Sequence, residues 1–144
     1  MATTHTFDST DRISDAAAGL TVSPSRQAFQ ILRFAYTVAP IVAGLDKFFN
    51  LLVDWEKYLP SMVTRLLGGN THLFVQGVGV IEIVAGIGIA LRPRLFSYVV
   101  AGWLAGIILN LLAIPGYYDV ALRDLGLALG ALALARLSAE FSER

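Results

Sequence analysis

The stretch LFSYVVAGWLAGIILNLLAIPGYY, residues 95–118, decides the fold class, because it contains no charged side chain. A helix rises about 1.5 Å per residue, so about 20 apolar residues cross the roughly 30 Å hydrocarbon core of a bilayer. Arg92 and Arg94 precede this stretch, and Asp119 follows it. We therefore predict a transmembrane helix over residues 95–115.

Three further apolar segments have the length of a membrane span, at residues 28–50, 72–91 and 117–137. The first contains Pro40, which we expect to kink its helix, as packed membrane helices tolerate. The segments are continuously apolar and do not alternate, which argues against a β-barrel. The predicted fold is all-α, an integral membrane up-down four-helix bundle. The alternative is a very apolar soluble bundle, which would have to bury an uncharged span inside 144 residues.

The composition supports the membrane class. Apolar residues make up 56% of the chain and charged residues 15%, against roughly 25% charged in an ordinary soluble domain. Eleven basic and eleven acidic residues balance, so nothing indicates a nucleic-acid partner. The chain has no cysteine, which excludes disulfides, thiol redox chemistry and thiolate metal sites of its own. No P-loop, GxSxG, HExxH or GxGxxG motif occurs in a fitting context, so we assign no catalytic and no metal-binding residues.

The segments outside the spans are more polar. We expect residues 1–27 to form a flexible N-terminal tail without a signal peptide, and residues 138–144 to form a short C-terminal tail. Between the first two spans, residues 51–70 place apolar side chains at helical spacing, with a break near Pro60 and an end at Gly68-Gly69. This predicts an interfacial amphipathic segment. It could be an anchor on the membrane surface or a lid over a site between the helices.

Basic residues in the short loops predict the orientation. The loop between the second and third spans carries Arg92 and Arg94, whereas the loop around Pro115-Gly116 carries none. We therefore expect a multi-pass protein of the bacterial inner (plasma) membrane with both termini cytoplasmic. Lys47, Lys57 and Arg65 in or beside the first loop disagree with this orientation.

Up-down topology brings the polar side chains of all four spans to the outer half of the bundle. A charge in mid-membrane costs roughly 2.5–3.5 kcal/mol on insertion scales, so such residues usually face the interior and pair. We predict a Glu82–Lys47–Arg123 network with Asn110 and Asp124 as hydrogen-bonding members. The candidate ligand-binding cluster is Asp46, Lys47, Glu82, Asn110, Arg123 and Asp124. It could bind a polar head group, a quinone ring or a proton, or it could be a structural clamp.

Small residues and one histidine complete the candidates. Glycines at GxxxG spacing let membrane helices approach closely, and we expect them to pack within the chain rather than against a partner. His72, at the outer end of the second span, could bind haem or donate a proton, although a lone interfacial histidine more often does neither. The GxxxG pairs are Gly102 with Gly106 and Gly126 with Gly130, and Gly79, Gly86 and Gly88 line the second span in the same role.

Several of these features together resemble the DoxX-like family of small four-helix membrane proteins. They are Arg33, the stretch GLDKF at residues 44–48, Glu82 with Gly86, and the stretch RDLG at residues 123–126. The resemblance spans about residues 28–137. It implies a membrane partner of redox or detoxifying enzymes, since the family takes its name from the small membrane subunit of a thiosulfate:quinone oxidoreductase. It implies no catalytic residues here, and the thiol chemistry of some relatives is absent because cysteine is absent.

We therefore expect an accessory or quinone-proximal subunit of a membrane respiratory or redox complex. The chain has no redox centre of its own, so electrons would come from another subunit. We expect no covalently bound cofactor, a quinone as the ligand, and the lipid bilayer and other membrane or redox subunits as partners. The alternatives are a non-enzymatic membrane scaffold or assembly subunit, and a small-solute or proton carrier that uses Glu82.

Overall fold

The computed structural model describes residues 23–141, and every regular element in this range is helical. Most of the predicted N-terminal tail and the last three residues lie outside the described residues. Within the described residues, three helices are long and apolar enough to cross a membrane, namely α2 (Pro24–Phe49), α4 (Thr71–Leu91) and α5 (Pro93–Leu112). A fourth long helix, α6 (Tyr118–Phe141), carries charged residues near both ends.

Helix α2 begins four residues earlier than the predicted start at residue 28. The Ser23 side chain accepts a hydrogen bond from the Arg26 backbone N–H at 3.3 Å, and Pro24 occupies the first helical turn. Both are common signals for a helix start. The helix continues through Pro40 and ends at Phe49, and the next residue, Asn50, caps it with a left-handed backbone at φ 51°.

Helix α6 also runs further than predicted. We placed the end of the fourth span at residue 137, but helical structure continues to Phe141. The Phe141 ring packs on Phe29 of α2, with ring centroids 5.3 Å apart. This tertiary contact gives the last turn of α6 a partner, so residues 138–141 do not belong to the predicted tail.

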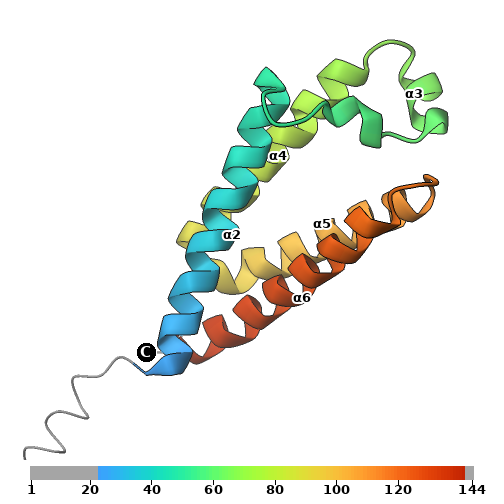
Figure 1. Ribbon diagram of the computed structural model, residues 1–144. Helices are drawn as coiled ribbons and strands as arrows, with labels where there is room; N and C mark the ends of the chain where they lie inside the picture. The colour runs from blue at the N-terminus through green and yellow to red at the C-terminus, as the bar shows by residue number, and fades with distance from the viewer. Residues whose placement is uncertain (1–22, 142–144) are drawn as a thin grey trace, which may run out of the picture.

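The helices form two antiparallel pairs, α2 with α4 and α5 with α6 (Figure 1). The pairs meet near the α4–α5 turn and diverge toward α3 (Ser61–Leu67) and the α5–α6 loop. The main core lies at the closed end, where Arg33 donates a hydrogen bond to the Ala90 carbonyl and Tyr36 donates one to the Leu127 carbonyl. The buried core residues are Tyr36, Ile89, Val100, Ala101, Ala131 and Leu134.

The segment between α2 and α4 contains a 3₁₀ helix, η1 (Trp55–Tyr58), followed by α3. The predicted break near Pro60 and the predicted end at Gly68 are confirmed, because Pro60 caps α3 and Gly68 takes a left-handed conformation with φ 55°. Residues 51–70 are partly buried on the side that packs on the helices and exposed on the other side. The most exposed apolar residues of this segment are Leu51, Leu52, Met62 and Leu66.

Candidate functional site

Lys47 and Glu82 form the predicted ion pair across two helices. The Lys47 Nζ lies 2.6 Å from a Glu82 carboxylate oxygen, and the two side chains are only 6% and 13% exposed. The same ammonium lies 3.6 Å from the centroid of the Trp55 ring, a cation–π contact. Lys47 therefore has two partners, one carboxylate and one aromatic face.

A close glycine contact positions this pair. A Cβ atom added to Gly79 would lie 2.6 Å from the Gly44 carbonyl oxygen and 3.1 Å from the Lys47 Cβ, so the two backbones touch here. Lys47 follows Gly44 by three residues, and Glu82 follows Gly79 by three residues. Residues three apart share a helix face, so the glycine contact presents the two charged side chains to each other.

Arg123 does not join this network, and that part of the prediction was wrong. Its guanidinium is 77% exposed and lies 3.8 Å from the Asp119 carboxylate, one turn away on the same helix. The aligned faces of an up-down bundle would have placed Arg123 near Glu82. Arg123 lies on the exposed face of α6, whereas the next residue, Asp124, lines the cavity together with Glu82.

Asp46 is buried but has a different task from the one predicted. Its carboxylate accepts hydrogen bonds from the backbone N–H groups of Leu51 and Leu52, both at 2.9 Å, and from the Trp55 indole at 2.8 Å. Three donors to one carboxylate organise the chain that leaves α2. Asp46 thus positions Trp55, and through it the aromatic face that Lys47 contacts.

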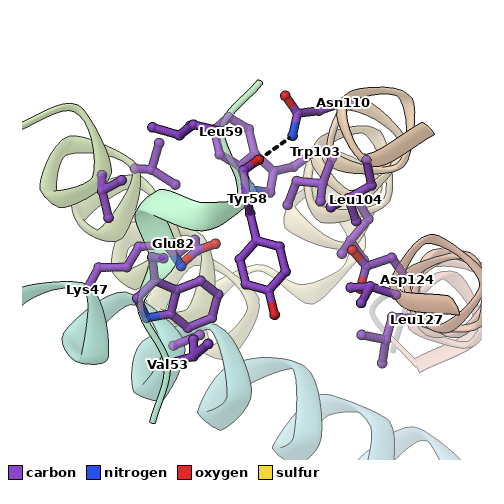
Figure 2. Close-up of a pocket in the computed structure, with 18 of the residues that line it drawn as sticks. Lys47, Val53, Tyr58, Leu59, Glu82, Trp103, Leu104, Asn110, Asp124 and Leu127 are labelled. Carbon is purple, nitrogen blue, oxygen red and sulfur yellow. Dashed lines mark hydrogen bonds and ion pairs between the residues drawn. The ribbon is translucent and has the colours of Figure 1, made fainter. Parts of the chain in front are cut away.

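A cavity of about 630 Å³ lies between the two helix pairs and contains the Lys47–Glu82 pair in its wall (Figure 2). All four long helices contribute to it, and η1 covers one side. Most of its wall is apolar. The polar or aromatic side chains in the wall are Lys47, Trp55, Tyr58, Phe74, Glu82, Trp103, Asn110 and Asp124.

The part of the segment 51–70 around η1 forms the cover of this cavity and is tied to the helices around it. Its residues in the cavity wall are Val53, Trp55, Tyr58 and Leu59. Asn110 of α5 donates a hydrogen bond to the Tyr58 carbonyl at 3.0 Å, drawn as a dashed line in Figure 2. The Tyr58 ring packs on Tyr117, with centroids 5.1 Å apart. At the start of α4, Thr71 donates to Glu56 at 2.6 Å. Asn110 therefore holds the cover and does not bond the charged pair as predicted.

Two polar groups in the cavity wall lack a well-aligned hydrogen bond within residues 23–141. The Trp103 indole N–H is buried, and the group that it interacts with is the adjacent Glu82 carboxylate, without good hydrogen-bond geometry. Asp124, half-buried on α6, makes no hydrogen bond or ion pair in this range, and its charge acts on Glu82. Figure 2 shows Tyr58 between Glu82 on one side and Asp124 on the other.

The glycines divide into two groups. Added Cβ atoms at Gly79, Gly86 and Gly88 would meet α2 or Phe96, so the predicted packing role of these three is confirmed. Gly130 likewise lies against the Tyr36 hydroxyl. The expectation was wrong for Gly102, Gly106 and Gly126, where an added Cβ meets nothing within 4 Å. Gly102 and Gly106 instead line the cavity.

His72 lies in the first turn of α4, where it contacts the segment that precedes this helix, and it does not line the cavity. Its ring lies 3.5 Å from the Glu56 carboxylate and 3.1 Å from the Gln76 amide, and its side chain is half-exposed. Among residues 23–141, no three His, Cys, Asp or Glu side chains gather as metal ligands would.

The sequence did not lead us to Trp103 as a site residue. It also did not connect Trp55, Tyr58 or Trp103 with the Lys47–Glu82 pair. Trp55 and Tyr58 suggested only a position at the lipid head groups. A signal for Trp103 was present, because it precedes Asn110 by seven residues and so shares its face of α5. The nearness of Trp55 to Lys47 depends on the loop that Asp46 organises, which no spacing rule predicts.

Comparisons with family models, curated proteins and solved structures found no match to this chain.

Proposed function

We propose that the chain is a DoxX-like integral membrane protein that receives a quinone head group in the cavity between its helix pairs. In this proposal it serves as an accessory or quinone-proximal subunit of a respiratory or redox complex in the bacterial inner membrane. The chain itself offers no redox centre, so a partner subunit supplies the electrons.

The membrane part of the proposal takes α6 as a fourth span beside the three apolar helices. Helix α6 packs along α5, and its other side exposes the leucines that a lipid-facing helix needs. Arg92 and Arg94 at the α4–α5 turn favour a cytoplasmic position for the closed end. The cavity then opens toward the outer side. The exposed leucines on this side of α6 are Leu122, Leu125, Leu129 and Leu132.

The observation that carries the ligand proposal is the pair of donors in an apolar cavity. Quinone carbonyl oxygens accept hydrogen bonds, and the wall offers two donors. They are the Trp103 N–H, which has no well-aligned acceptor, and the N–H groups of Lys47 beyond the one that bonds Glu82. A quinol hydroxyl is a donor, and Asp124 is an acceptor without a donor. The remaining wall is largely apolar, which is typical of sites for small hydrophobic molecules.

The chain carries its own reporter for this site, because its only two tryptophans, Trp55 and Trp103, both line the cavity. We would purify the full chain in detergent and titrate it with a short-chain ubiquinone while following tryptophan fluorescence. The expected result is saturable quenching. The matched variants are Gly106→Phe, which fills the cavity, and Gly126→Phe, which adds the same ring in open space away from it.

Quenching that disappears in Gly106→Phe and persists in Gly126→Phe supports the proposal. Quenching that is linear in quinone, or equal in both variants, reflects quinone dissolved in the micelle and refutes it. A second test copurifies the partner complex. If Glu82→Gln lowers the amount of assembled complex but leaves its specific quinone activity unchanged, the chain is a scaffold subunit instead.

A further inference from the structure

The charges that line the cavity do not balance. Two carboxylates, Glu82 and Asp124, face one ammonium, Lys47. Lys47 is already committed, because it lies 2.6 Å from Glu82 and 3.6 Å from the Trp55 ring centroid. Asp124 is therefore the group whose charge nothing in the cavity wall neutralises.

Arg123, the basic residue next to Asp124 in the chain, does not neutralise the Asp124 carboxylate. Its side chain is 77% exposed and pairs with Asp119. Across the cavity lies the Glu82 carboxylate, which has the same charge as Asp124 and repels it. An isolated carboxylate in an apolar site is costly, and membrane proteins usually pair such groups or use them.

The rest of the wall suits a cation that carries apolar groups. Trp55, Tyr58 and Trp103 line the cavity, and aromatic faces attract ammonium and guanidinium groups. Trp55 already holds one ammonium in this way, that of Lys47.

We propose that this cavity binds an amphipathic organic cation, with the charged group beside Asp124 and the apolar part against the aromatic and aliphatic wall. The inference goes beyond the proposed quinone function. It concerns the same cavity, but it depends on the charge of Asp124, whereas a neutral quinone does not require that charge.

Tetraphenylphosphonium and tetraphenylborate test the proposal, because they share size and shape and carry opposite charge. We would measure equilibrium binding of each radiolabelled ion to the full chain in detergent. Wild-type protein is expected to bind the phosphonium saturably and the borate at least about tenfold more weakly, which corresponds to about 1.4 kcal/mol. Equal binding of both ions would overturn the proposal, whatever the variants show.

Two pairs of variants locate the binding. Asp124→Asn is expected to weaken phosphonium binding by about tenfold or more, while Asp119→Asn on the exposed face of the same helix leaves it unchanged. Asp124→Asn should fold, since it removes a charge that has no partner. Gly106→Phe should abolish binding and Gly126→Phe should preserve it. Phosphonium binding that survives Asp124→Asn or Gly106→Phe refutes the assignment to this cavity.

The quinone titration separates the two proposals. Saturable quinone quenching in a protein that fails to prefer the phosphonium refutes this inference and leaves the proposed function intact. Preferential phosphonium binding in a protein without saturable quenching refutes the proposed function and supports the inference.

Discussion

Removing Lys47 from the buried ion pair should destabilise the protein more than any other single charge removal at this site. Lys47→Met keeps much of the aliphatic side chain but leaves the Glu82 carboxylate, 13% exposed, without its cation. The Trp103 N–H is the remaining donor beside it. Glu82→Gln is milder, because the Lys47 ammonium keeps its contact with the Trp55 ring.

The magnitude follows from the burial of the pair. Breaking a buried ion pair by removing one partner costs about 3–5 kcal/mol. The cost of a lone carboxylate has a ceiling, since the group can take up a proton instead. For an unperturbed glutamate with a pKa near 4.3, protonation at pH 7 costs about 3.7 kcal/mol at about 1.36 kcal/mol per pH unit. We therefore expect Lys47→Met to cost about 3 kcal/mol at pH 7. We expect Glu82→Gln to cost less by about 0.5–2 kcal/mol, the value of a cation–π contact.

Because protonation of Glu82 sets the upper limit on this cost, it also sets the direction in which the cost of Lys47→Met changes with pH. Protonation becomes cheaper as pH falls, so the cost of Lys47→Met should shrink toward about 1.6 kcal/mol at pH 5.5. The assay is reversible unfolding in mixed micelles, followed by helical circular dichroism. Lys57→Met is the control, because Lys57 is exposed and lies 5.0 Å from the Tyr58 ring centroid. A loss below about 0.5 kcal/mol for Lys47→Met, or a loss that grows with acidity, would refute the reasoning.

Two further variants test how the site is built. Asp46→Asn replaces an acceptor facing three donors, so the loop after α2 should loosen at a cost of about 1–3 kcal/mol, seen as faster amide exchange at Leu51 and Leu52. Unchanged exchange there would contradict the role of Asp46. Gly79→Ala places a Cβ 2.6 Å from the Gly44 carbonyl oxygen and should lower the melting temperature, whereas Gly77→Ala, which meets nothing, should raise it slightly. Equal melting temperatures for the two variants would mean that α2 and α4 do not touch at this point.

The helices were predictable because each is a local property of the chain. Residues 72–91 and 95–115 contain almost no charge, and the helices Thr71–Leu91 and Pro93–Leu112 lie close to those bounds. The break at Pro60 and the end at Gly68 were also local, since proline and glycine restrict or release the backbone at their own positions. The ends that were misplaced are those where a capping serine or a distant phenylalanine extended a helix.

The pairing of Lys47 with Glu82 was predictable from the free-energy cost of burying an unpaired charge. Each buried charge needs a partner, and few basic residues were available. Arg123 was wrongly placed in this network because pairing charges by cost alone does not consider which face of its helix a residue occupies. In the structure, Arg123 lies on the exposed face of α6, whereas Asp124 lines the cavity.

By itself, the sequence determined that this chain forms long apolar helices and that Lys47 and Glu82 need each other, since hydrophobicity and the cost of a buried charge belong to the residues. Only the tertiary structure decided which polar groups share one space. The angle between the α2–α4 and α5–α6 pairs opens a cavity of about 630 Å³, and the loop organised by Asp46 brings Trp55 into its wall. Such an angle arises from contacts between distant segments, and it leaves Asp124 as the unmatched charge on which the proposed ligand class depends.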